Sequence, residues 1–485
     1  MGIVASQSFK NIIFTYLGFL IGAINTLFLY TKFLSDSDYG LVGYILSLAH
    51  VIMPLMAFGA HNTLVKFYTS YKTRVSLHSF LTLVLLLPLV MAIPLSFICY
   101  SCYDVIANAL SKTNPIVKHY LWHGIITAIA LAYFEVFFAW VKVHMKTVFG
   151  NFMKEVFHRV GAMLLLVLLY FELLNVEQFI FSLVIVYVIR MLVMCAYAFS
   201  VKPPVIIFKH LSNKVNVLKY AFLMIIAGSI ASVLLEVDKV MLGYYIPIKQ
   251  IAYYNVAVFV TAVIAVPQRS MHQILLPLSA KYLNEKDFDA LGNLYKRSAL
   301  NLFIVSGLIF LLIIGNINEL YHLIAEEYRV GIFTVLVIGA TKLYDAYLGS
   351  NNAILFNSDY YRIVLLLGVF LTVLMVVLNV IFIPVIGING AALATFLAVF
   401  TYNTIKLVFV YKKFKIHPFS SNILKIAVLI LLSIVLFYFW EFSFHPIINI
   451  ALKSILITSL FVFVVYKFNF SEDISFQIKK YLRIK

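Results

Sequence analysis

Five ionisable side chains stand inside long apolar stretches of the sequence. Arg190 lies in VIVYVIRMLVM, Lys342 and Asp345 share TKLYDAY, Glu135 lies in AYFEVFFAW, and Glu236 follows AFLMIIAGSIASVLL. A charge inside a bilayer costs at least about 2.5–3.5 kcal/mol on insertion scales, so such residues are retained for a function or for pairing. The chemistry open to them is anion binding, cation binding or proton transfer.

Depth within the apolar runs separates these candidates. If the sixth run begins near residue 177, Arg190 lies about 20 Å along a helix, and no acid neighbours it in the sequence. Arg190 is predicted to bind substrate in a polar cavity. The alternatives are a salt bridge to another helix or a side chain extended toward the cytoplasm. Lys342 lies about 18 Å along the tenth run, with Asp345 one turn later on the same face. Lys342 is predicted to hold an anion and Asp345 to take up a proton, unless the two residues only neutralise each other.

Two further acids are candidates for ion coupling. Glu135 is an isolated acid in the inner half of the fourth run, where a buried carboxylate could bind a proton or sodium. A structural acid held by hydrogen bonds is the alternative. Glu236 lies about 25 Å along the seventh run, near the outer boundary, and Lys239 is close enough to pair with it. That pair is interpreted first as an interfacial ion cluster that ends the helix, and second as a coupling site facing the cavity.

Arg159 and Asn25 complete the candidate substrate-binding set. Arg159 and Glu155 are four residues apart near the cytoplasmic end of the fifth run, which favours an interfacial ion pair. Asn25 could line the transport path, although a single polar residue on a helix more often joins neighbouring helices. No residue pattern predicts a catalytic site, a metal site or a cofactor. The three cysteines form no metal-binding spacing and no disulfide framework (Cys99, Cys102 and Cys195).

The elements that carry these residues are predicted from composition and run length. The 485-residue chain is 63% hydrophobic and 12% charged, against about 45–50% and 25% in soluble domains. Apolar runs of about 20 residues recur from end to end, and backbone in hydrocarbon must satisfy its own hydrogen bonds, so the fold class is all-α and polytopic. The fourteen predicted spans are 9–31, 40–64, 77–101, 117–141, 151–171, 177–199, 219–243, 250–272, 297–316, 330–355, 361–383, 389–411, 422–441 and 446–466.

Basic residues in alternate loops predict the orientation. About three quarters of the 37 Lys and Arg residues fall in one alternating set of loops, which the positive-inside rule makes cytoplasmic. Both termini are then cytoplasmic. This set includes Lys66, Lys72, Arg74, Lys142, Lys146, Lys154, Lys202, Lys209, Lys281, Lys286, Lys296, Arg297, Lys406, Lys412, Lys413, Lys479, Lys480, Arg483 and Lys485. Because these charges are dispersed along the chain, the formal charge of +17 does not indicate nucleic-acid binding.

The spans are predicted to form two equivalent lobes. Residues 1–212 would hold helices 1–6, residues 213–415 helices 7–12, and residues 416–485 two further helices and a cytoplasmic tail. One long cytoplasmic connection, AKYLNEKDFDALGNLYKRSA, is predicted to be an amphipathic surface helix. Repeats of this kind in transporters place the substrate site between the two halves.

Four segments, taken together in order, resemble the polysaccharide (O-antigen type) flippases of the multidrug/oligosaccharidyl-lipid/polysaccharide exporter superfamily. They are FLSDSDYGLVGYILSL, DKVMLGYYIPIKQIAYYNVA, LLPLSAKYLNEKDFDALGNLYKR and LNVIFIPVIGINGAALAT. The resemblance implies a flippase of the bacterial cytoplasmic (inner) membrane that moves undecaprenyl-pyrophosphate-linked oligosaccharide by alternating access. It also implies membrane lipids, H⁺ or Na⁺ as coupling ion, and other polysaccharide-assembly proteins as partners.

Three other functions stay open at this stage. A cation-coupled multidrug antiporter would need an acidic cavity, whereas Arg190 and Lys342 are basic. A membrane enzyme acting on the same lipid-linked sugars usually needs a sizeable outer loop, and the predicted outer loops are all short. A peptidoglycan-precursor flippase of the same superfamily is not excluded by any residue.

Overall fold

The computed structural model describes residues 3–208, 213–440 and 442–482. It divides into two compact units, unit 1 (Met1–Ala252) and unit 2 (Tyr253–Lys485). Each described residue of regular structure is helical, and none is in a strand. Lys209, Arg483 and Lys485 of the predicted cytoplasmic loops lie outside the described residues.

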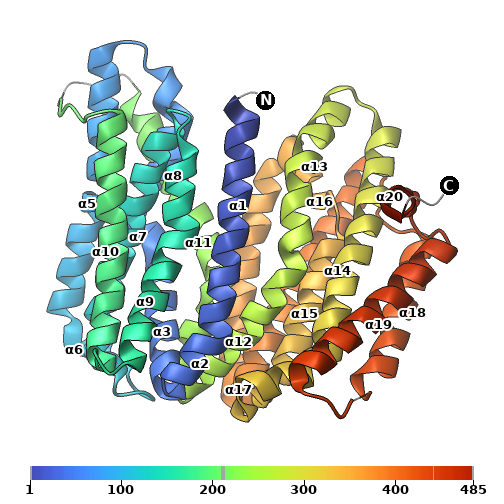
Figure 1. Ribbon diagram of the computed structural model, residues 1–485. Coiled ribbons are helices and arrows are strands. Elements are labelled where there is room, and N and C mark those ends of the chain that lie inside the picture. The colour runs from blue at the N-terminus through green and yellow to red at the C-terminus, as the bar shows by residue number, and fades with distance from the viewer. Residues whose placement is uncertain (1–2, 209–212, 441, 483–485) are drawn as a thin grey trace. The chain divides into compact units, whose positions relative to one another are not determined.

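Unit 1 is a bundle in which α7 occupies the centre and packs against α3, α4, α5 and α10 (Figure 1). Its long helix α11 packs against α3 and α4. The elements are α1 (Ile3–Ile24), η1 (Asn25–Leu29), α2 (Tyr30–Phe33), α3 (Asp36–Ala57), α4 (Ala60–Phe67), η2 (Tyr68–Ser70), α5 (Arg74–Ser101), α6 (Tyr103–Leu110), α7 (Val117–Lys142), α8 (Thr147–Phe152), η3 (Met153–Phe157), α9 (His158–Tyr170), α10 (Val176–Val201) and α11 (Lys214–Tyr245).

Unit 2 begins within α12, and its helix α14 packs against α15, α18 and α19. The elements from α12 onward are α12 (Lys249–Ala262), η4 (Val263–Ala265), α13 (Val266–Asn284), α14 (Phe288–Ile324), η5 (Glu326–Gly331), α15 (Ile332–Tyr347), α16 (Asn351–Asn357), α17 (Tyr361–Phe414), α18 (Ser421–Tyr438), α19 (Pro446–Lys467) and α20 (Glu472–Leu482).

The predicted spans are present as helices. Eleven described helices are long and apolar enough to cross a membrane, and the two limbs of α11, which meet at 62°, bring the number to 12. α17 contains two predicted spans that meet at a non-helical turn, Ile386–Gly387, where Gly387 has φ +59° and ψ −132°. Only glycine adopts that conformation readily. With α17 divided there, and with the charged segment 147–170 as one more span, the chain is the predicted all-α polytopic protein of about 14 helices.

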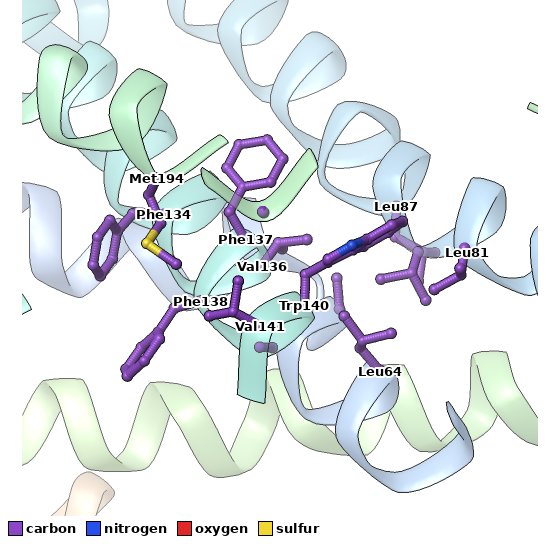
Figure 2. Close-up of a cluster of buried hydrophobic side chains, with 14 of the residues drawn as sticks. Leu64, Leu81, Leu87, Phe134, Val136, Phe137, Phe138, Trp140, Val141 and Met194 are labelled. Carbon is purple, nitrogen blue, oxygen red and sulfur yellow. The ribbon is translucent and has the colours of Figure 1, made fainter. Parts of the chain in front are cut away.

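The core of unit 1 is built around α7. Figure 2 shows Trp140 between Leu81 and Leu87 of α5 on one side and Phe134 and its neighbours on the other. Met194 of α10 lies beside Phe134. This close packing fixes the orientation of α7, and therefore of Glu135, which is adjacent to Phe134 in the chain.

One predicted element is wrong. The segment predicted as an amphipathic surface helix is instead the end of α13, a tight turn and the start of α14. Lys286 in that turn has φ +57°, and the side chain of Asp287 accepts a hydrogen bond from the N–H of Ala290, which starts α14. The apolar periodicity was real, but it belongs to two helices that pack against each other. Leu291, for example, is fully buried.

The predicted domain boundaries at residues 212 and 415 stay predictions.

Candidate functional site

The polar site in unit 1 includes a close contact between α1 and the segment η3–α9. Gly18 and Gly22, four residues apart, leave room on α1 for the Arg159 side chain: a methyl group at Gly18 would lie 2.8 Å from Arg159 Nη1 and would collide with the Glu155 carbonyl. Asn25 follows on the same face, and its Nδ2 donates to the Arg159 carbonyl oxygen over 2.7 Å. Small residues of this kind allow helices to approach closely in a membrane.

Both helices change to π-helix at this contact, at Asn25–Leu29 and at Met153–Phe157. Single π turns inside α-helices occur often at functional sites. Arg159 Nη1 lies 3.7 Å from Glu155 Oε2, so the predicted pair is formed. The Arg159 side chain is 26% exposed, whereas Asn25 is buried and its Oδ1 has no hydrogen-bond partner in the described chain.

Arg190 lies inside unit 1 among aromatic side chains. Its guanidinium carbon is 4.1 Å from the centre of the Phe134 ring and 5.2 Å from that of Tyr187. Its Nη1 is 3.3 Å from Nδ1 of His158 and donates to it. Arg190 is 5% exposed, and its Nε has no partner among the described residues. Cation–π contacts stabilise a desolvated guanidinium by about 2 kcal/mol, but they do not neutralise its charge.

Glu135 and Glu236, two acids of unit 1, each have a basic partner. Glu135 is isolated along the sequence, but in the structure Lys154 Nζ lies 2.6 Å from its Oε1. Lys154 was placed in a cytoplasmic loop, but η3 carries it to the face of α7. Glu236 accepts hydrogen bonds from Lys239 Nζ and from the Ser47 hydroxyl, both over 2.7 Å.

The ion pair of Glu236 does not end its helix, which corrects the first interpretation of these charges. α11 continues for nine residues beyond Glu236, to Tyr245. Glu236 and Lys239 lie on the second limb, Leu234–Tyr245, beyond the bend. The contact of Glu236 with Ser47 places the carboxylate between α11 and α3, which pack together.

These residues form one polar cluster in unit 1. Glu135, Glu155 and Arg159 act electrostatically on Arg190, and the charges of Glu236, Lys239 and Arg190 all act on the His50 imidazole. Three carboxylates are matched by three bases, as the pairs Glu135–Lys154, Glu155–Arg159 and Glu236–Lys239. Within the part of the chain that the structure describes, Arg190 makes no ion pair. Arg190 therefore differs from Lys154, Arg159 and Lys239, each of which pairs with a carboxylate.

Unit 2 holds its candidate charges differently. Asn403 Nδ2 donates to Asp345 Oδ1 over 3.0 Å, and Gln268 Nε2 donates to the Asp345 carbonyl over 3.2 Å. Lys342 is half-buried, one turn before Asp345 on α15. The Asp345 carboxylate thus lies between α15 and the second half of α17, where an amide donor holds it.

Sequence reasoning missed Lys406, which it assigned to a cytoplasmic loop. Lys406 is 1% exposed on α17, donates to Asn352 Oδ1 over 2.8 Å, and lies within the electrostatic influence of Asp345. A signal was present, because Asn403 and Lys406 precede the charge cluster KKFK by enough residues to lie inside the span. His158 was also missed. Its neighbour Arg159 was singled out, but nothing in the sequence pairs His158 with Arg190.

The comparisons with known proteins agree with this architecture. The profile of the family described as "Polysaccharide biosynthesis protein" matches residues 8–283, more than half of the chain. The chain belongs to this family. No curated protein matches it significantly.

Solved structures share the fold at low sequence identity. The lipid II flippase MurJ in an inward closed conformation superposes with a TM-score of 0.75 at 15% identity, over 95% of this chain and 99% of that one. An inward-facing multidrug resistance MATE transporter gives a TM-score of 0.66 at 12% identity, over 82% and 94%. A transporter of the same superfamily from Pyrococcus furiosus, whose title reports a binding pocket of reversed polarity, gives 0.55 at 13% identity, over 85% and 95%.

Proposed function

We propose that this protein is a flippase that moves undecaprenyl-pyrophosphate-linked oligosaccharide units across the bacterial inner membrane for polysaccharide biosynthesis. Membership of the polysaccharide biosynthesis family supports the pathway, and the shared fold with flippases and exporters supports transport by alternating access. An oligosaccharide head carries many hydroxyls and a pyrophosphate, and each unpaired polar group costs about 2–7 kcal/mol in hydrocarbon. A helical protein that offers polar groups inside the membrane lowers that cost without any covalent step.

The buried guanidinium of Arg190, which makes no ion pair within the described chain, is the observation that carries the proposal. Burying a guanidinium without a carboxylate partner is costly. We therefore expect such a residue where a bound anionic ligand neutralises its charge. A planar guanidinium matches phosphate oxygens bidentately. An anion bound at Arg190 would neutralise the guanidinium, whereas a cationic drug would be repelled by it. This favours an anionic cargo over the cargo of a multidrug antiporter.

Roles for the other candidates follow from their positions. Arg159, more exposed than Arg190, is proposed to meet the pyrophosphate first. Asn25 holds the Arg159 backbone against α1. Lys342 is proposed as the basic group of unit 2, and Asp345 as the residue whose protonation or cation binding gates transport. Glu135 and Glu236 are the next candidates for coupling, although each already has a lysine partner.

A second candidate is a flippase for the peptidoglycan precursor. MurJ aligns over 95% of this chain and 99% of its own, whereas the MATE transporter aligns over 82% of this chain and 94% of its own. That difference favours a lipid-linked cargo. The two candidate functions differ in the sugar that the lipid carries, so transport is measured with both cargoes.

Proteoliposomes test the proposal directly. Wild-type protein should move a fluorescent polyprenyl-pyrophosphate oligosaccharide across the bilayer, and Arg190→Gln should slow it at least tenfold. Arg190→Lys should recover part of the rate, because the charge remains. Arg329→Gln, at an exposed arginine of η5, is the matched control and should leave the rate unchanged. Preferred movement of lipid II would favour the second candidate. Movement of a cationic dye, with no anionic cargo moved, would overturn both.

The orientation proposed with this function has both termini in the cytoplasm. Cysteines at Lys72 and Glu327, two exposed positions, should react with a membrane-impermeant reagent from opposite sides of intact cells. Only the cysteine at Glu327 should be labelled from outside. Labelling of the cysteine at position 72 from outside would contradict the proposed orientation.

A further inference from the structure

The C-terminal helix α20 begins only four residues after α19 ends. α19 is one of the helices long and apolar enough to cross a membrane, and its last residue is Lys467. α20 begins at Glu472. Four intervening residues span at most about 14–18 Å, so α20 cannot leave the membrane surface.

A polar clamp fixes the start of α20 to α14. Asp473 accepts hydrogen bonds from Nε and Nη2 of Arg297, the first over 3.1 Å, and from Asn301 Nδ2 over 2.7 Å. The Ser471 hydroxyl donates to Asn301 Oδ1 over 2.6 Å. Asn422 of α18 donates to the Phe470 carbonyl over 2.9 Å. The start of α20 is thus held by two spanning helices.

Arg297 also marks the level of the membrane boundary. It is the last charged residue before the uncharged stretch 298–318 of α14. Those twenty-one residues measure about 32 Å in a helix, close to the roughly 30 Å thickness of the hydrocarbon layer. Arg297 and the clamp therefore lie at the level of the lipid headgroups.

Beyond the clamp, α20 presents an aromatic residue and two lysines on one face. Phe476 is 65% exposed, and Lys479 and Lys480 are exposed and follow it by three and four residues. Residues at that spacing are neighbours on a helix surface. An aromatic side chain beside lysines is typical of helices that lie in the membrane interface, with the ring inserted and the cations at the phosphates. The two acidic residues of the helix, Glu472 and Asp473, stand in its first turn at the clamped end.

We propose that the exposed face of α20 binds the anionic phospholipid surface of the membrane. Phe476 inserts between acyl chains, while Lys479 and Lys480 contact headgroup phosphates. The clamp orients the helix so that this face meets the lipid. The inference does not depend on the identity of the cargo.

A fluorescent probe at position 476 tests this binding. Phe476→Cys, labelled with an environment-sensitive NBD group in a background where Cys99, Cys102 and Cys195 are alanine, is reconstituted in nanodiscs. Emission should shift to the blue in discs that contain phosphatidylglycerol and return toward the aqueous value in pure phosphatidylcholine or at high salt. Equal emission in both lipids would overturn the proposal. Shielding that rises with protein concentration would also overturn it, because it would assign the face to a second copy.

Charge-matched variants separate lipid binding from general electrostatics. Lys479→Ala/Lys480→Ala should weaken the response to phosphatidylglycerol by about fivefold per lysine. Lys72→Ala/Lys112→Ala, which removes the same charge from two exposed positions of unit 1, should leave it unchanged. An equal loss in both double variants would show a bulk charge effect and overturn the site.

Variants of the clamp test its orienting role. Asp473→Ala should keep the response to anionic lipid but make the thiol at position 476 react faster with an aqueous reagent in phosphatidylcholine. Glu472→Ala, at the neighbouring exposed acid, is the control and should not change that rate. Unchanged reactivity in Asp473→Ala would overturn the orienting role of the clamp.

Discussion

The two units neutralise their buried charges by different means. In unit 1 three carboxylates meet a basic side chain directly, in the pairs Glu135–Lys154, Glu155–Arg159 and Glu236–Lys239. In unit 2 the charges inside the spans have amide partners: Asn403 donates to Asp345, Asn352 accepts from Lys406, and Asn449 donates to Glu319. The direct pair Arg297–Asp473 lies at the start of α20, outside the spans. A direct pair cancels charge locally. An amide satisfies hydrogen bonds and leaves the charge in place.

This difference suits the two units to different tasks. In unit 1 three carboxylates are paired with bases, while the buried Arg190 makes no ion pair among the described residues, which suits recognition of an anion. Asp345 of unit 2 keeps its charge available, and that charge acts on Lys406 and Tyr402 without a direct contact. Protonation of Asp345 would therefore change the field on its neighbours. A ligand or proton drives a conformational change only if it interacts differently with two states.

Replacing Asp345 should have the largest effect on transport. Asp345→Asn removes the charge and keeps the shape and the ability to accept from Asn403, so it mimics the protonated form. The variant should bind the lipid-linked sugar at least as well as wild type and turn over at least tenfold more slowly, with little dependence on a pH or sodium gradient. Transport in proteoliposomes with and without each gradient measures this. Wild-type rates and gradient dependence would leave Asp345 a structural residue and move the coupling role to Glu135.

A pair of lysine substitutions should reveal the contrast in stability. Lys154→Met leaves Glu135 without its cation, and breaking a buried pair costs about 3–5 kcal/mol, less here because the Lys154 side chain is 40% exposed. Lys406→Met removes a cation held by a neutral amide and should cost about 1–3 kcal/mol, the penalty for one unsatisfied group. Thermal unfolding in detergent ranks the two variants, with exposed Lys146→Ala as control. A larger loss in Lys406→Met would contradict the comparison.

The smallest expected effect is an acid sensitivity at the clamp of α20. The hydrogen bonds from Arg297 lower the pKa of Asp473, and those from Asn301 act in the same direction. A carboxyl whose pKa is lowered by folding contributes stability above its unfolded pKa of about 3.9, and the contribution is lost as the pH falls through the folded value. Aqueous labelling of a thiol at position 476 should therefore be constant from pH 7 to about pH 5 and should rise below about pH 4. A rise already between pH 7 and pH 6 would mean that another group controls the clamp.

Sequence reasoning predicted what depends on length and composition, and failed where partners come from other helices. The spans were predictable because about 20 apolar residues leave few alternatives to a membrane helix. The pair Glu236–Lys239 was predictable because its members are three residues apart. Lys154 reaches Glu135 across nineteen residues, and no pattern along one helix reports such a contact. The position of Lys406 was missed for a related reason, because a charge near the end of a span was assigned to the loop.

The turn between α13 and α14 was likewise not predictable from the sequence pattern. The apolar positions of that segment fit one helix, and the residue that breaks it, Lys286, is not a typical turn residue at positive φ. Arg190 was predictable only in part. Its depth followed from counting residues, whereas its aromatic surroundings from α7 and α10 could not be read from its own neighbours.

The glycine face of α1 has a consequence for the order of events during synthesis. Gly18 and Gly22 emerge from the ribosome well before Arg159, which they accommodate. At about 5–20 residues per second, the interval is roughly 10–30 s. During that interval α1 stands in the bilayer with an unfilled groove. Arg159 enters later beside Glu155, and the pair lowers the cost of insertion before either residue meets α1. α1 is therefore made well before its partner and completes its packing only when the fifth span arrives.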